Sequence, residues 1–372
     1  MPRFALVTSG LGNAHGGIGV VASMIGRALA RHGSTAIWRH PHERPRPVRL
    51  GALVARSVAG SLPPPDFVFY DHVDLARLHA LNPLLARTPY GIFMHGTDVW
   101  RPMDPRRRRA IERAAVLCAG SGTTVARMRR DNPWFTGEPV VTWLGVRPRA
   151  GAAEGDEPRA GDVSASEPSR REAPSTPGAR RARLALIVGR MDRSERYKGH
   201  DPILDAWPIV TAAVSDAKLV VLGGGDDRAR LEARARDEAI EHVEFLGAVP
   251  DAERDALYAS CGVFLFPSTG EGFGLAAIEA ALAGAPVLGV RGEVIEEILP
   301  NASLRIDAQS GPAIAQAVIR LFRDPALARD LGERGRARAS SMFLEGHFIE
   351  RFERAVLPHL AARRAPRDGA RP

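Results

Sequence analysis

Two glutamates eight residues apart, Glu271 and Glu279, have the type and spacing to bind hydroxyl groups of a ligand. Glu271 lies between glycines in the stretch "STGEGFG", and Glu279 lies in the alanine-rich segment that follows, which predicts a helix. At about 100° of rotation per residue, the direction of Glu279 returns to within about 80° of the turn, roughly 7–8 Å along an axis starting near Gly274. The spacing therefore predicts two separate carboxylate positions along one ligand.

Two cationic side chains, Arg190 and Lys198, lie in the loop "GRMDRSERYKG", which follows an apolar run. An arginine fork and a lysine point charge commonly bind a diphosphate together. Lys198 is one of only two lysines among 51 basic residues. Each of these features alone is more often an ordinary turn or surface charge. Because all of them follow strands of one domain, together they predict a site for a nucleotide diphosphate sugar, with one carboxylate for the sugar and one for the ribose.

The elements that must position these residues alternate between strand and helix. In the second half, apolar runs predict strands at residues 184–189, 218–223, 243–247, 263–268 and 286–290, with helices between them. The first half shows the same rhythm, with predicted strands at 4–8, 35–38, 66–71, 90–96, 115–121 and 139–145. This alternation predicts an α/β fold with two doubly wound parallel sheets, whose ligands bind at the carboxyl ends of the strands.

Composition divides the chain into four parts. Residues 150–183 are rich in Pro, Gly, Ser, Ala and charge, so they lack the apolar surface that would offset the entropy of ordering. We expect them to be a disordered linker between an N-terminal domain at 1–149 and a nucleotide-sugar-binding domain at 184–340. The remaining residues, 341–372, predict an amphipathic helix over 345–360 and a basic tail.

Charge and cysteine content narrow the class of protein. Residues 1–150 contain 21 arginines, no lysine and 9 carboxylates, whereas the rest of the chain carries a small negative excess. A basic first half favours an anionic surface or substrate nearby. The four arginines from Arg106 to Arg109 predict either a solvated helix face or contact with an anionic membrane surface. The chain has two distant cysteines, and its N-terminal apolar run is typical of a first strand. No apolar run is long enough to span a membrane. Together these features favour a cytoplasmic protein.

The stretch "FPSTGEGFGLAAIEAALAGAPVLG" resembles the E-x7-E signature of the retaining glycosyltransferases of family GT4, which have the GT-B fold. The segments "VGRMDRSERYKG", "VVLGGGDDRARLE" and "VEFLGAVPDAERDALYASCGVFLFPS" resemble other parts of that family's second domain. In the first half, "GGIGVVASMIGRALARHGSTAIW" resembles its glycine loop and helix, and "HGTD" resembles its His-Gly motif. The resemblance implies two Rossmann-like domains that face each other across a cleft, with the acceptor bound by the first and the sugar nucleotide by the second. It also implies that the helix over 345–360 crosses back to the first domain.

The resemblance also implies a role for each matching residue. Arg190 and Lys198 would bind the diphosphate, and Glu279 would bind the ribose. Catalytic contacts to the sugar would come from Glu271 and His95. Further donor contacts would come from Gly16 and Gly17 and from the backbone of Gly272, Phe273, Gly274 and Leu275. The family implies retention of the anomeric configuration, and no bound metal or other cofactor. The absence of a D-x-D motif from the sequence agrees with the expectation of no metal.

The predicted function is transfer of a sugar from a nucleotide diphosphate sugar to a glycan or lipid-linked acceptor, in the cytoplasm or at the inner face of the cell membrane. We expect it to serve cell-surface polysaccharide or glycolipid synthesis. The sequence leaves open the sugar, the base and the acceptor. It also departs from the family pattern after residue 289, where the strand layout is not predicted. One alternative is a sugar-nucleotide epimerase on the same fold. Another is a basic nucleic-acid-binding protein, which the lack of an aromatic-interleaved basic patch disfavours.

Overall fold

The computed structural model describes residues 1–12, 16–40, 46–147 and 181–361. The chain divides into two compact units, Val146–Leu344 and Met1–Gly145 together with the segment from Glu345 onward. The predicted linker at 150–183 lies outside the described residues except for its last three. Two of these, Ala182 and Arg183, already belong to the first strand of the second unit, which begins two residues earlier than predicted.

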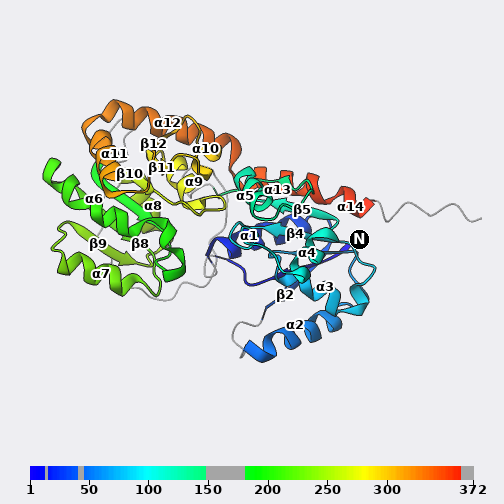
Figure 1. Ribbon diagram of the computed structural model, residues 1–372. Coiled ribbons are helices and arrows are strands. Elements are labelled where there is room, and N and C mark those ends of the chain that lie inside the picture. Colours follow the sequence, from blue (N-terminus) through cyan, green and yellow to red (C-terminus); the bar gives the residue numbers. More distant parts are fainter. Residues whose placement is uncertain (13–15, 41–45, 148–180, 362–372) are drawn as a thin grey trace, which may run out of the picture. The chain divides into compact units, whose positions relative to one another are not determined.

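The second unit contains a six-stranded sheet whose paired strands are all parallel (Figure 1). Its strands are β7 (Ala182–Val188), β8 (Lys218–Leu222), β9 (Val243–Gly247), β10 (Cys261–Phe266), β11 (Val287–Val290) and β12 (Ser303–Ile306). Its α-helices are α6 (His200–Ala213), α7 (Arg228–Asp237), α8 (Asp251–Ser260), α9 (Leu275–Leu282), α10 (Val294–Ile298), α11 (Gly311–Arg323) and α12 (Pro325–Met342). A 3₁₀ segment, η4 (Arg193–Lys198), precedes α6.

The strand order of this sheet is β12-β11-β10-β7-β8-β9. Read from β9, it is the 3-2-1-4-5-6 order of a doubly wound nucleotide-binding domain, which confirms the predicted fold class of this half. The order reverses between β7 and β10, the point at which such sheets bind their ligands. The loops that carry Lys198 and Glu271 follow β7 and β10 directly.

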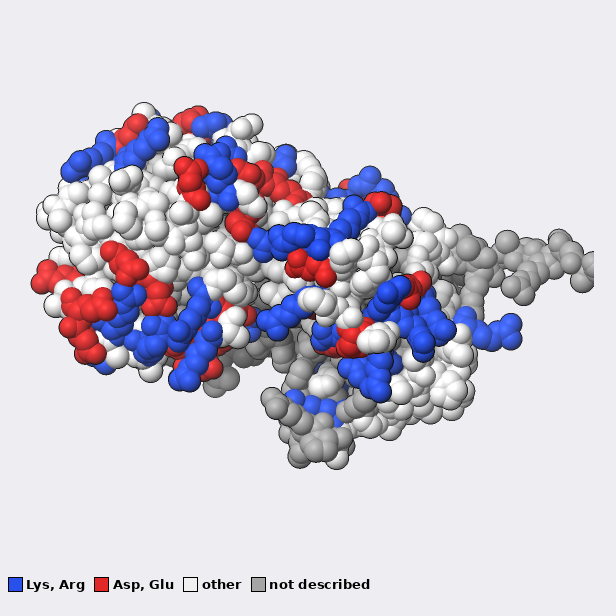
Figure 2. Space-filling view, viewed as in Figure 1, with Lys and Arg blue, Asp and Glu red and all other residues white. Residues whose placement is uncertain are grey.

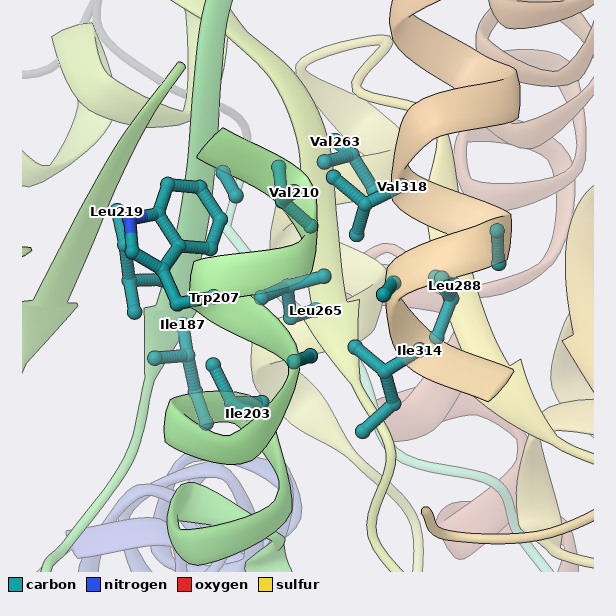
Figure 3. Close-up of a cluster of buried hydrophobic side chains, with 14 of the residues drawn as sticks. Ile187, Ile203, Trp207, Val210, Leu219, Val263, Leu265, Leu288, Ile314 and Val318 are labelled. Atoms are coloured by element: carbon teal, nitrogen blue, oxygen red, sulfur yellow. The ribbon is translucent and has the colours of Figure 1, made fainter. Parts of the chain in front are cut away.

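The core of the second unit explains why its central strands are apolar throughout. All six residues of β10 are buried, as expected for a parallel strand that is covered on both faces. Figure 3 shows the packing on one face, where α6 contributes Ile203, Trp207 and Val210, α11 contributes Ile314 and Val318, and the sheet contributes Ile187, Leu219, Val263, Leu265 and Leu288.

The last strand that the sequence predicts, at residues 286–290, is not the last strand of this sheet. The chain continues through the five-residue helix α10 to β12, which pairs in parallel with β11. The sequence of β12, "SLRI", contains an arginine and a serine and so lacks the continuous apolar run that predicts the other strands, and α10 is too short to show a helical period.

The first unit contains a second six-stranded parallel sheet, in the order β2-β1-β3-β4-β5-β6. Its strands are β1 (Arg3–Thr8), β2 (Ser34–Arg39), β3 (Phe67–Tyr70), β4 (Tyr90–Met94), β5 (Val116–Ala119) and β6 (Val140–Val141). Its α-helices are α1 (Gly16–Ala30), α2 (Arg46–Gly60), α3 (Leu78–Leu81), α4 (Pro105–Glu112), α5 (Gly122–Asp131), α13 (Glu345–Val356) and α14 (Pro358–Ala361). The order reverses between β1 and β3, so this sheet is also doubly wound and has a switch point of its own.

Helix α13, from the end of the chain, packs on the first unit. The Phe348 ring lies 6.3 Å from that of Phe93 in β4, and the Phe352 ring lies 4.9 Å from that of Phe69 in β3. Both helix phenylalanines are fully buried. The amphipathic pattern over 345–360 therefore serves the core of the first unit, although the residues just before it belong to the second.

Candidate functional site

The loops after β7 and β10 meet at the switch point of the second unit. The Lys198 ammonium Nζ lies 2.6 Å from Glu271 Oε1, with about a fifth of each side chain exposed. Burial alone lowers the pKa of Lys198, but the neighbouring Glu271 carboxylate outweighs it, so the pKa lies above its usual value. Lys198 therefore remains charged at neutral pH. The two residues that the sequence assigns to the diphosphate and to the sugar are in direct contact.

Arg190 belongs to the same cluster through an acid that the sequence analysis missed. Its guanidinium forms a hydrogen-bonded ion pair with Glu195, and Nζ of Lys198 lies 3.6 Å from the other oxygen of that carboxylate. Glu195 thus connects the two predicted diphosphate ligands. It lies inside "RSERYKG", where nothing in its local sequence distinguishes it from its charged neighbours.

The glycine turn after β10 begins helix α9 as predicted. Gly274 has φ of 88° and is the N-cap residue of α9, which starts at Leu275. A Cβ atom at Gly274 would lie 2.6 Å from the ring of Phe266, so both the left-handed backbone and the close packing require glycine. Phe273 points into the protein, is 4% exposed and packs edge-on against Phe343. The Phe273 side chain is therefore a core group, and the donor contacts predicted for Gly272 to Leu275 remain a prediction about their backbone.

Glu279 lies on α9 and is held by a tyrosine. The Tyr258 hydroxyl, from α8, donates a hydrogen bond of 2.9 Å to Glu279 Oε2. Tyr258 is fully buried, which makes it a rigid partner. Glu271 and Glu279 therefore have different neighbours: a lysine ammonium for the first, and a buried phenol for the second.

The turn "GGGDD" after β8 supports the Arg190 loop. Met191 N–H donates to the carbonyl of Gly224, and Asp227 N–H donates to the carbonyl of Met191, both at 2.8 Å. A Cβ atom at Gly225 would lie 2.2 Å from that Met191 carbonyl oxygen, so only glycine fits this close approach. Arg196 Nε also donates to Asp227 Oδ2 at 3.0 Å. Backbone and side-chain contacts thus join the β7 loop to the turn after β8.

The remaining predicted site residues, Gly16, Gly17 and His95, lie in the first unit. The two glycines begin α1, and a Cβ atom at Gly16 would meet nothing within 4 Å. His95 follows β4, and its Nε2 lies 2.6 Å from the backbone carbonyl of Asp71. A carbonyl only accepts, so Nε2 carries the proton. Burial lowers the pKa of His95 to about 4, so the ring is neutral at pH 7 with its lone pair on Nδ1.

Two carboxylates that the sequence analysis did not select organise this part of the first unit. Asp98 Oδ1 accepts hydrogen bonds from the N–H groups of His95 and Gly96, at 3.1 and 2.7 Å, and thereby shapes the "HGTD" turn. Asp71 is fully buried at the end of β3, and its Oδ2 accepts from the Thr8 hydroxyl at 2.5 Å. Burial raises the pKa of Asp71 to about 7. Because it follows β3, Asp71 lies beside the switch point of this sheet.

Among residues 1–12, 16–40, 46–147 and 181–361, no group of three or more His, Cys, Asp and Glu side chains could hold a metal ion. In the same ranges, every helix is too short or too polar to cross a membrane.

The second unit contains most of the residues that match a known protein family. Residues 173–338 match the family described as "Glycosyl transferases group 1". The phosphatidyl-myo-inositol mannosyltransferase of Mycobacterium leprae is 33% identical over 162 residues, which are 42% of this chain and 41% of that protein. A GDP-mannose-dependent alpha-(1-6)-phosphatidylinositol monomannoside mannosyltransferase of Mycobacterium tuberculosis is 34% identical over 149 residues, 37% of this chain and 39% of that protein. The chain thus spans about two fifths of the length of these relatives.

Solved structures match almost the whole chain. The sucrose-phosphate synthase of Thermosynechococcus elongatus has a TM-score of 0.74 and 20% identity, covering 97% of this chain and 100% of that one. Anabaena HepE in complex with UDP and glucose has a TM-score of 0.71 and 15% identity, covering 96% of this chain and 100% of that one. The two parallel sheets and these matches define the GT-B fold. The match of residues 173–338 to the group 1 glycosyl transferases agrees with the resemblance that the sequence shows in that half of the chain.

Proposed function

We propose that this protein is a retaining glycosyltransferase that moves a hexose from a nucleotide diphosphate sugar to a lipid-linked or glycan acceptor, in glycolipid or cell-surface polysaccharide synthesis. The observation that carries the proposal is the contact between Lys198 and Glu271 at the switch point of a group 1 glycosyl transferase domain. The mannosyltransferase relatives, whose names include phosphatidylinositol, favour a lipid-linked acceptor. The protein would act in the cytoplasm or at the inner face of the cell membrane.

The cluster around Glu195 indicates how the donor binds. Arg190 and Lys198 are already neutralised by carboxylates, so a diphosphate would replace these acids as the partner of the two cations. Loss of the lysine contact would leave the Glu271 carboxylate to accept hydrogen bonds from hydroxyls of the donor sugar. Glu279, held by Tyr258, would accept hydrogen bonds from the ribose.

Glu271 has the charge needed to stabilise the reacting sugar. As the bond to the leaving diphosphate breaks, positive charge develops on the sugar and negative charge on the diphosphate. A fixed carboxylate near the first and fixed cations near the second stabilise the transition state more than the ground state. The cations Arg190 and Lys198 would neutralise the leaving group without a bound metal, and no cofactor is required. His95, with its neutral Nδ1 acceptor, would contact a hydroxyl of the sugar.

An exposed stripe of arginines on α4 provides a surface for an anionic membrane. Within the predicted Arg106–Arg109 region, Arg107 forms a two-bond ion pair with Asp74, and Arg108 pairs with Glu112. The side chains of Arg106, Arg109 and Arg113 form no ion pair within the described part of the chain, and all are exposed. Their spacing of three and four residues places them on one side of the helix.

This stripe would hold the protein near its acceptor. Figure 2 shows basic side chains gathered on the surface around α4. We include in the proposal that Arg106, Arg109 and Arg113 attract anionic lipid headgroups, since each arginine near such a surface contributes about 1 kcal/mol. Nucleic acid is not an expected partner.

A ligand screen followed by product analysis tests the proposed function. Thermal shift is measured with GDP, UDP, ADP and their sugars, beginning with GDP-mannose and UDP-glucose because relatives and matched structures carry these names. A ligand at 100 times its dissociation constant should add about 2.7 kcal/mol of stability. Incubation of the stabilising sugar nucleotide with phosphatidylinositol vesicles should give a glycosylated lipid. A changed sugar nucleotide without acceptor would instead indicate an epimerase, and salt-sensitive binding of DNA or RNA would indicate the nucleic-acid alternative.

A further inference from the structure

A glutamine distant in sequence joins the two loops of the donor site. Gln309 lies between β12 and α11, in the loop that follows the edge strand of the sheet. Its side-chain amide nitrogen Nε2 donates to the backbone carbonyl of Tyr197 and to that of Pro267, both at 2.7 Å. The first carbonyl precedes Lys198 in the β7 loop, and the second begins the β10 loop that carries Glu271.

The geometry uses the whole hydrogen-bonding capacity of the amide nitrogen. An amide NH₂ has two N–H groups, and both face carbonyl oxygens, which can only accept. Among the residues with comparable side chains, asparagine is shorter by one methylene, and glutamate offers no N–H donor. Of these three residues, only glutamine can make both bonds.

Neighbouring contacts show that the two loops are tightly joined here. Thr269 N–H donates to the same Tyr197 carbonyl at 3.0 Å, and a Cβ atom at Gly270 would lie 2.8 Å from the Tyr197 ring. The Gln309 amide itself lies against Gly199, where a Cβ atom would approach its nitrogen to 2.8 Å. The loops that carry Lys198 and Glu271 are thus joined by one direct backbone bond and by one side chain from a third loop.

We propose that Gln309 is a positioning residue of the donor site, which sets the separation of Lys198 from Glu271 by holding the backbones of their loops together. The inference rests on the proposed function, because it assumes that Lys198 binds the donor diphosphate. In this proposal Gln309 acts through the backbone carbonyls of Tyr197 and Pro267 and not by contact with the donor. Without Gln309, the β7 loop loses one of its links to the β10 loop, and Lys198 is no longer held at the position that a diphosphate requires.

The test compares Gln309→Leu with Gln309→Glu in the full-length protein. Leucine removes both hydrogen bonds at similar volume, and glutamate places a carboxylate against two carbonyl oxygens. We expect both variants to weaken binding of the stabilising nucleoside diphosphate about 10-fold by calorimetry, and to raise the donor KM more than they lower kcat. Glutamate should have the larger effect because it adds repulsion to the loss of the bonds.

A double-mutant cycle separates positioning from a general effect on the fold. If Gln309 acts through Lys198, the variant Gln309→Leu/Lys198→Ala should bind nucleotide no more weakly than Lys198→Ala alone. In the variant Gln309→Leu/Glu279→Gln, the second substitution changes the ribose contact. There the fold-losses of nucleotide affinity caused by the two single substitutions should multiply. Multiplication in both cycles would mean that Gln309 stabilises the fold and has no particular link to Lys198.

The remaining outcomes distinguish this inference from the proposed function. Wild-type binding of a nucleoside diphosphate with unchanged affinity in Gln309→Leu would overturn the role of Gln309 and leave the function standing. If wild-type protein bound none of GDP, UDP and ADP, the proposed function would fail, and the assignment of Gln309 to a donor site would fail with it.

Discussion

The Lys198 ammonium lies 2.6 Å from the Glu271 carboxylate, although 73 residues separate them in the chain. The contact joins the loops after β7 and β10, between which the order of the second sheet reverses. Two groups that are both expected to bind the donor therefore neutralise each other. A diphosphate with its sugar would offer each of them a new partner. We therefore expect donor binding to replace this ion pair by a contact of Lys198 with the diphosphate and by hydrogen bonds from sugar hydroxyls to Glu271.

Replacement of Lys198 should slow the reaction because it removes the proposed hydrogen bond between the lysine ammonium and the donor diphosphate. A hydrogen bond to a charged group is worth about 1.5–3 kcal/mol, so Lys198→Ala should lower kcat/KM by about 10–150-fold. The chain offers a matched control, because its only other lysine, Lys218, is exposed at the start of β8. Lys218→Ala should leave kcat/KM within about two-fold of wild type. Equal kinetics for the two variants would exclude Lys198 from the donor site.

Glu271 and Glu279 should differ in the kinetic constant that they control. Glu271 lies where it can stabilise positive charge on the reacting sugar, so Glu271→Gln should mainly lower kcat. Glu279, on the helix and bound to Tyr258, would hold the ribose equally in ground and transition states, so Glu279→Gln should mainly raise the donor KM. Steady-state kinetics at saturating acceptor measures both. A loss of kcat in Glu279→Gln as large as in Glu271→Gln, with KM unmoved, would place both carboxylates at the reacting centre.

Transfer should not depend on a divalent cation. The sequence contains no D-x-D motif, and Arg190 and Lys198 supply two positive charges for the leaving diphosphate. Initial rates with and without excess EDTA should agree within about two-fold. Removal of a catalytic metal would have a far larger effect, because such a metal stabilises the transition state by several kcal/mol. Activity that EDTA abolishes and Mg²⁺ or Mn²⁺ restores would contradict this expectation.

The α4 stripe should control binding to anionic vesicles. At about 1 kcal/mol for each arginine, the variant Arg106→Gln/Arg109→Gln/Arg113→Gln should partition about 100-fold less onto vesicles with anionic lipid. Arg236, Arg320 and Arg329 are exposed arginines of the second unit, and their replacement by glutamine matches the change in net charge. Cosedimentation with anionic and zwitterionic vesicles measures the partition. An equal loss in both triple variants would indicate attraction by net charge alone.

Buried Asp71 should make the stability of the first unit depend on pH. Burial raises its pKa in the folded protein to about 7 from 3.8, so between these values the unfolded chain is ionised while the folded one keeps its proton. Ionisation of Asp71 therefore favours unfolding. The resulting loss in the free energy of unfolding grows between about pH 4 and about pH 7 and reaches at most about 4 kcal/mol. Below pH 4 this loss is absent.

The variant Asp71→Asn removes this titration while its carbonyl can still accept from the Thr8 hydroxyl. Its free energy of unfolding, relative to wild type, should therefore rise from pH 4 to pH 7 and remain level above. Urea unfolding followed by tryptophan fluorescence reports mainly on the first unit, because four of the five tryptophans, all except Trp207, lie there. A difference between the two proteins that stays constant from pH 4 to pH 8 would contradict the prediction.

Local sequence patterns were sufficient to predict most of the fold. Long apolar runs such as 263–268 are recognisable as buried parallel strands, and Gly274 marks the start of α9 because a left-handed residue is needed there. The positions of Arg190, Lys198, Glu271 and Glu279 relative to these elements also follow from the sequence. Hydrophobic period, turn residues and loop position are properties of short segments, so a single chain displays them directly.

Tertiary structure alone decided which of these segments meet. The sequence does not show that β7 lies beside β10, and this adjacency is what brings Lys198 to Glu271 and places Gln309 between their loops. The sequence likewise does not show that β12 pairs with β11, or that Phe348 and Phe352 of α13 pack on Phe93 and Phe69, which lie 255 and 283 residues earlier in the chain. Strand order and helix docking depend on long-range burial of apolar surface, which favours one global arrangement and leaves no local pattern. The types of residue in the site were therefore readable in the sequence, whereas their pairing was set by the fold.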